Sequence, residues 1–108
     1  MDPGLMYQAV ASGEVDVISA FSTDGRIAAY DLVLLEDDLG VIPPYDAILL
    51  ASPRLTREAP DVLDALRALE GAIDEPRMQG LNYSVDEDGE SPAAVAEKLL
   101  GELREPRE

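Results

Sequence analysis

The sequence contains two continuous apolar runs of strand length, at residues 32–35 and 47–51. Continuous runs of this length are typical of strands that are buried on both faces of a helix-covered sheet. An acidic stretch at residues 36–38 and the pair Pro43-Pro44 separate the runs, so the runs cannot form one element. Residues 15–21 read as a third strand, because apolar residues alternate there and β-branched residues are frequent. The sequence therefore predicts a small sheet of about three strands.

Helices dominate the rest of the sequence, where apolar residues recur at helical spacing and capping residues mark the starts. They are predicted at residues 3–12, in one or two turns through Ile27 and Tyr30, at 53–58, at 61–73, after Asp74 as N-cap, and after Ser91 with Pro92 at the first position. Together with the strands they indicate an α/β fold. Two buried strands need neighbours on both sides, so this thin sheet favours an incomplete chain or pairing with another copy.

The charge balance and the missing residue types exclude several functions. The chain has 108 residues, 23 acidic and 8 basic, and a formal net charge of −15. Such a chain repels phosphate backbones, so nucleic acid is excluded as a partner. Without cysteine or histidine there is no thiolate nucleophile, no zinc–sulfur site and no usual general base. We expect no catalytic residues, no metal site and no cofactor, since the acidic runs at 36–38 and 86–90 also lack calcium-loop spacing.

Two aromatic residues lie where strand-like segments meet loops. Phe21 ends the first segment, and Tyr45 follows Pro43-Pro44 just before the 47–51 run. Ligands of α/β proteins usually bind at such junctions, and two ring faces in an acidic protein suit an organic cation. The alternative is that Phe21 is an ordinary core residue and Tyr45 a half-buried residue at the rim.

Residues 22–26, Ser-Thr-Asp-Gly-Arg, form a turn that opens a helix. The free N–H groups of such a turn can bind an anion such as a carboxylate, and Arg26 could add a charge-assisted contact. The alternative is a capped turn with Arg26 in solvent.

Several motifs together resemble a known family. They are Ser-Thr-Asp-Gly-Arg at 22–26, Pro-Pro-Tyr at 43–45 and Leu-Asn-Tyr at 81–83, within similar flanking sequence from about Gly4 to Leu103. The chain resembles the C-terminal part of the substrate-binding proteins of osmoprotectant ABC transporters. That family takes up glycine betaine, choline, carnitine and related quaternary ammonium compounds.

The resemblance implies a partial type II periplasmic-binding-protein-like fold, because a whole member is more than twice as long. Such proteins have two α/β lobes with the ligand between them. By this mapping, residues 1–29 finish the second lobe, residues 30–44 cross between the lobes, and residues 45–108 form the C-terminal part of the first lobe.

The resemblance also implies a site. The family encloses the quaternary ammonium in a box of aromatic rings, of which Phe21 and Tyr45 match two, while Thr23, Asp24 and Arg26 match the adjoining motif. The family commonly has tyrosine where this chain has Phe21, so the ring face is kept and the hydroxyl is lost. The implied partners are the ligand and a transporter permease, and the implied location is outside the cytoplasm, although no signal peptide is visible in this chain.

Other readings remain open. A homodimer or a complementing half could supply the missing rings, since two cation–π contacts alone predict weak binding by this chain. The chain could instead be a truncated acidic interaction or dimerisation domain that no longer binds ligand. An enzyme is the least favoured reading, because no nucleophile–base pair is visible.

Overall fold

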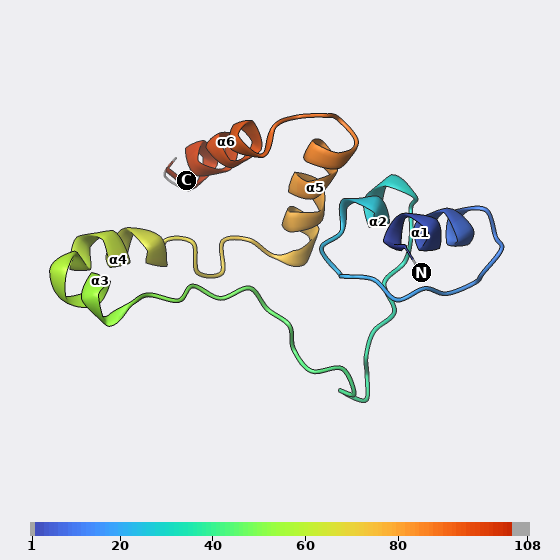
Figure 1. Cartoon of the computed structure of the whole chain (residues 1–108), viewed down its shortest axis with the longest axis horizontal. Coiled ribbons are helices and arrows are strands. Elements are labelled where there is room, and N and C mark those ends of the chain that lie inside the picture. Colours follow the sequence, from blue (N-terminus) through green and yellow to red (C-terminus); the bar gives the residue numbers. More distant parts are fainter. Residues whose placement is uncertain (1, 105–108) are drawn as a thin grey trace. The chain divides into compact units, whose positions relative to one another are not determined.

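The computed structural model describes residues 2–104. These residues form helices joined by extended or irregular segments (Figure 1). The helices are α1 (Pro3–Ala11), α2 (Gly25–Ala29), α3 (Pro53–Glu58), α4 (Pro60–Arg67), α5 (Glu75–Asp86) and α6 (Pro92–Arg104). No strand is present between residues 2 and 104.

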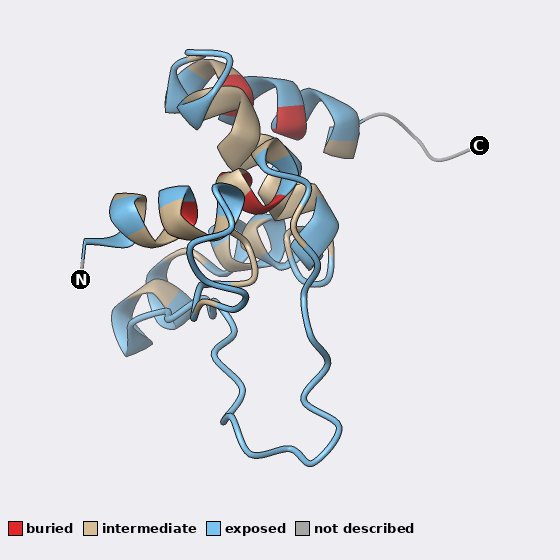
Figure 2. Cartoon of the chain, turned by 90° about the vertical axis from the view of Figure 1, so that its right-hand side faces the viewer, coloured by how far each residue is buried: buried red, intermediate tan, exposed pale blue. Residues whose placement is uncertain are grey.

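The predicted sheet of about three strands is therefore wrong, and the described chain is helical rather than α/β. Residues 15–21, 32–35 and 47–51 do not form a ladder with one another, and Figure 1 draws the long connection between α2 and α3 as a tube without arrows. An apolar run indicates that its side chains avoid water. It does not indicate which other segment would supply the hydrogen-bond partners that a strand needs. Every residue from 33 to 50 is exposed instead (Figure 2).

The chain divides into two compact units. In its described part, the first unit comprises residues 2–34 and 74–104, and the second comprises residues 35–73. The predicted lobe boundaries concern a whole receptor, and they stay a prediction.

The first unit contains the buried side chains of the described chain. Its helix α2 packs on α5, and α5 packs on α6. Four hydrophobic residues are buried there, namely Tyr7, Ile27, Val95 and Leu99. In the second unit α3 packs on α4, and neither helix has a buried residue.

Local capping signals explain where the helices begin. Asp24, Ser52 and Asp74 each accept a hydrogen bond from a backbone N–H in the first turn of the helix that follows. Proline stands in the first turn of α3, α5 and α6, where its missing N–H costs nothing. The predicted helices at 3–12 and 53–58 and those after Asp74 and Ser91 are confirmed. The helix predicted at 61–73 is shorter, because residues 68–72 form successive turns with i→i+3 hydrogen bonds.

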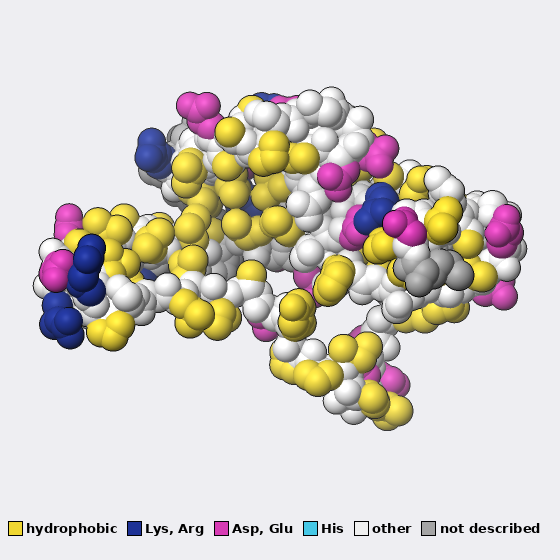
Figure 3. All heavy atoms as spheres, in the orientation of Figure 1, with side chains coloured by type: hydrophobic (Ala, Val, Ile, Leu, Met, Phe, Trp, Pro, Cys, Tyr) yellow, Lys and Arg dark blue, Asp and Glu magenta, His cyan; other side chains and the backbone are white. Residues whose placement is uncertain are grey.

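The extended connection carries a large share of the exposed apolar side chains. In Figure 3, hydrophobic side chains follow the segment between α2 and α3 over much of its length. None of the described helices is both long enough and apolar enough to cross a membrane.

Candidate functional site

The motif at residues 22–26 forms a tight turn that leads into α2. The backbone N–H of Asp24 donates to the carbonyl of Phe21 at 3.1 Å, which closes the turn. The Asp24 carboxylate then accepts the backbone N–H of Arg26 at 3.0 Å and caps α2. Phe21 and Thr23 therefore lie on one short, hydrogen-bonded loop at the start of a helix.

Asp24 and Arg26 are joined by a bidentate ion pair. Arg26 Nε donates to Asp24 Oδ1 at 3.0 Å, and Arg26 Nη2 donates to Asp24 Oδ2 at 2.8 Å. The Asp24 side chain is 15% exposed, and the hydrogen bonds from Arg26 lower its pKa. The guanidinium that was predicted to meet an anion thus already has a carboxylate partner within the chain.

Tyr7 of α1 completes this arrangement. The Arg26 guanidinium carbon lies 4.3 Å from the centre of the Tyr7 ring, within the range of a cation–π contact. The Tyr30 ring stacks on Tyr7 with centroids 6.3 Å apart. Tyr7 is 2% exposed, and burial, followed by the nearby Asp24 charge, raises its pKa to about 12. We call Tyr7, Asp24, Arg26 and Tyr30 the Tyr7 cluster.

Helix α5 holds the loop through two side-chain amides. Gln79 Nε2 donates to the Ser22 carbonyl at 2.5 Å, and Asn82 Nδ2 donates to the Thr23 carbonyl at 2.6 Å. At Gly25, a Cβ atom would lie 2.6 Å from the backbone nitrogen of Tyr83. The α5 backbone can therefore approach the start of α2 only because residue 25 has no side chain.

The two predicted ring residues belong to different units. Phe21 is in the first unit and is 69% exposed, whereas Tyr45 is in the second unit and is 88% exposed. The structure thus brings Phe21, Thr23, Asp24 and Arg26 together on one loop, whereas Tyr45 belongs to the other unit. Neither ring lies in a hydrophobic core.

A comparison with known protein families identifies the family of this chain. Residues 1–102 match the substrate-binding domain of ABC-type glycine betaine transport systems. The chain belongs to this family. Members are binding domains and not enzymes, which confirms that prediction, and the sequence resemblance is confirmed as well.

Individual relatives agree with the family assignment. The chain is 40% identical over 100 residues to the carnitine transport binding protein OpuCC of Listeria monocytogenes, covering 93% of this chain and 32% of the relative. It is 34% identical over 103 residues to the ergothioneine transport permease/ergothioneine binding protein EgtU of Helicobacter pylori, covering 95% of this chain and 19% of the relative. The chain thus spans about a third or less of these relatives.

A solved structure shows the same fold for most of the chain. The crystal structure of a glycine betaine/carnitine/choline ABC transporter superposes with a TM-score of 0.88 at 44% sequence identity. The superposition covers 94% of this chain and 38% of that one. Most of this chain therefore has a structural counterpart within a longer solved chain.

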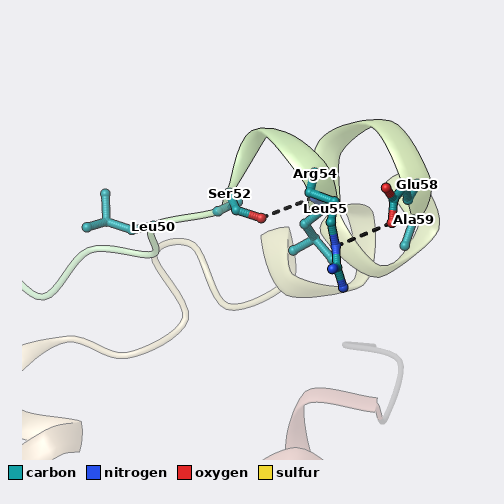
Figure 4. Close-up of a pocket in the computed structure, with 7 residues that line it drawn as sticks. Leu50, Ser52, Arg54, Leu55, Glu58 and Ala59 are labelled. Atoms are coloured by element: carbon teal, nitrogen blue, oxygen red, sulfur yellow. Dashed lines mark hydrogen bonds and ion pairs between the residues drawn. The ribbon is translucent and has the colours of Figure 1, made fainter.

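The second unit has a hollow that is separate from the predicted site residues. It has a volume of about 420 Å³ and lies beside α3 (Figure 4). Its lining residues are Leu50, Ala51, Ser52, Arg54, Leu55, Glu58 and Ala59. All of them fall within ten consecutive positions, and the drawn interactions are the Ser52 cap and the Arg54–Glu58 ion pair. The hollow is thus formed by α3 and the residues directly beside it in the sequence.

Sequence reasoning missed three residues that shape the loop. Tyr7 lies 17 positions or more from its partners Asp24 and Arg26, and no local pattern signals their contact. Gln79 and Asn82 are 57 and 59 positions from the carbonyls that they bind. The available signal was the family resemblance, whose stretches include Tyr7 and Asn82 but assign neither residue a role.

Proposed function

We propose that this chain supplies part of the ligand cleft of a receptor that binds a quaternary ammonium osmoprotectant, namely glycine betaine, choline or carnitine. The receptor delivers the ligand to an ABC transporter permease and acts outside the cytoplasm. The observation that carries the proposal is the family match over residues 1–102, with relatives that are named for carnitine and glycine betaine.

The two exposed rings have the chemistry that such a ligand requires. A quaternary ammonium group keeps its charge at every pH and has no N–H to donate, so carboxylate hydrogen bonds cannot select it. Aromatic faces attract it through the ring quadrupole, by about 0.5–2 kcal/mol for each ring. The exposure of Phe21 and Tyr45 supports their assignment as two walls of the enclosure.

The loop residues beside Phe21 have supporting roles in this proposal. Thr23 contributes a hydroxyl at the start of α2, where it can reach the polar end of a ligand. Asp24 and Arg26 lie on the same loop and form an ion pair with each other. This pairing supports the proposal, because an unpaired guanidinium would repel a cationic ligand.

We propose that another polypeptide segment completes the enclosure. Two rings contribute too little to offset the several kcal/mol of entropy that binding costs, so the chain alone should bind weakly. The relatives are about three times as long, and the further rings would come from the part of them that this chain does not match.

A receptor chimera tests the proposal. In the Listeria OpuCC protein, the stretch that aligns with this chain is replaced by residues 1–103, and carnitine, choline and glycine betaine are titrated by calorimetry. We expect binding, and we expect Phe21→Ala and Tyr45→Ala each to weaken it about 2- to 30-fold. Phe21→Tyr keeps the ring face and is the matched control.

Two results would contradict the proposal. One is a folded chimera that binds none of the three ligands. The other is a binding chimera in which neither alanine variant changes the affinity. The latter would favour the alternative that this region is an interaction domain without a role in ligand binding.

A further inference from the structure

The loop that carries Phe21 is held at two consecutive carbonyl groups by one helix. Gln79 and Asn82 of α5 donate to the Ser22 and Thr23 carbonyls over 2.5 and 2.6 Å, and both bonds are partly buried. Phe21 is the next residue toward the N-terminus, and its own carbonyl accepts the N–H of Asp24 at 3.1 Å. Three successive carbonyls of this loop are therefore held.

The residue types on α5 are better explained by these long-range hydrogen bonds than by helix propensity. Asparagine in a helix interior is disfavoured, because its side chain competes for backbone hydrogen bonds. Asn82 nevertheless stands in the interior of α5, with Gly80 two positions before it. A residue with a low helix propensity is explained here by the carbonyl to which it donates, 59 positions away.

Gly25 sets the distance between α5, which carries the side-chain amides of Gln79 and Asn82, and the loop that they bind. Its Cα lies so close to α5 that an added Cβ would come within 3 Å of three backbone atoms of Asn82 and Tyr83. Backbone contact of this kind has little freedom to slide. The backbone contact therefore fixes the position of the Asn82 side chain relative to the loop. Gln79, one turn earlier on α5, donates its hydrogen bond to the neighbouring carbonyl.

We infer that Gln79 and Asn82 are positioning residues that set the direction in which the Phe21 ring projects toward a ligand. They act through the backbone of residues 22 and 23 and do not touch the ligand. The functional consequence rests on the proposed function, but the positioning itself is a property of this chain and can be measured without a ligand.

The sequence offers an unusually clean probe, because Phe21 is its only phenylalanine. Labelling with ¹⁵N- and ¹³C-phenylalanine gives one amide signal and one ring system in the NMR spectrum. The variants are Asn82→Leu and Gln79→Met, which keep size but remove the donor. Gln8→Met makes the same chemical change at an exposed position of α1 and is the control.

We expect the Phe21 amide order parameter to fall from about 0.85, typical of a rigid backbone, to below about 0.6 in both α5 variants. The Gln8→Met control should keep the original value. Unchanged order in both α5 variants overturns the inference, whether or not the chain binds any ligand. Helix content by circular dichroism identifies a variant that unfolds, and the other variant then decides.

The receptor chimera supplies the functional arm. If Asn82 acts through Phe21, then Asn82→Leu weakens carnitine binding at least threefold with Phe21 present and has no effect in the Phe21→Ala background. An equal loss in both backgrounds overturns the inference. A chimera without any binding defeats the proposed function instead, and the NMR result then decides the positioning role alone.

Discussion

At the scale of single residues, the Tyr7 cluster shows how a charged pair is held beside a buried aromatic ring. The Arg26 guanidinium is engaged by the Asp24 carboxylate and lies over the Tyr7 ring. The Tyr7 hydroxyl is buried and has no hydrogen-bond partner among the described residues. A buried hydroxyl without a partner costs about 1–3 kcal/mol, so the ring, rather than the hydroxyl, stabilises the cluster.

This arrangement predicts a loss of stability at alkaline pH. The pKa of Tyr7 is raised from 10.0 to about 12 by burial and by the Asp24 charge. A raised pKa means that the folded state holds the proton more tightly than the unfolded state does. The stabilisation is present below pH 10 and should fade between pH 10 and 12, by on the order of 2 kcal/mol. Urea unfolding across this range measures it.

Tyr7→Phe is the matched control for that measurement. The variant keeps the ring that meets Arg26 and Tyr30 and removes the buried hydroxyl that has no partner, so its stability at pH 7 should rise by about 1–3 kcal/mol. The loss of stability that the wild type shows above pH 10 should be absent in this variant. A destabilisation of more than 1 kcal/mol at pH 7 would instead show that the hydroxyl donates to the Asp24 carboxylate.

At the scale of elements, the packing of α2 on α5 depends on one missing side chain. Gly25→Ala should destabilise the first unit by about 1–3 kcal/mol, because a Cβ there meets the α5 backbone rather than a flexible side chain. Chemical denaturation followed by circular dichroism measures the change.

Gly80→Ala on α5 separates packing from helix propensity. A Cβ at this position meets nothing within 4 Å, so the substitution should stabilise the helix by about 0.5–1 kcal/mol. If Gly25→Ala were also neutral or stabilising, the close approach of α2 and α5 would not hold in solution.

The elements also show which features can be read from a sequence. The starts of α3, α5 and α6 were predictable because proline and a Ser or Asp cap act within a few residues. The three predicted strands were wrong, since a strand needs a partner that no local pattern names. The features of the candidate site also fall into a predictable and an unpredictable group. The turn at residues 22–26 has a local signature, whereas the bonds from Gln79 and Asn82 depend on contacts between distant positions.

At the scale of the whole molecule, exposed apolar surface coexists with a large net charge. The described segment from residue 33 to residue 50 is exposed throughout and includes apolar side chains that are more than 70% exposed, such as Leu35, Leu39 and Leu50. Such a segment favours association, while a net charge of −15 keeps copies apart. The balance between these two forces should depend on ionic strength.

Salt therefore provides a test of that balance. At pH 7, the Debye length falls from about 30 Å in 0.01 M salt to about 3 Å in 1 M salt, so repulsion between copies is screened. We expect light scattering to detect concentration-dependent association in 1 M NaCl but not in 0.01 M NaCl. The triple variant Leu35→Gln, Leu39→Gln and Leu50→Gln has the same charge and less apolar surface, so it should stay dispersed in both. Equal association of the variant and the wild type would mean that other surfaces drive it. Association of the wild type in 0.01 M NaCl would mean that the charge does not limit it.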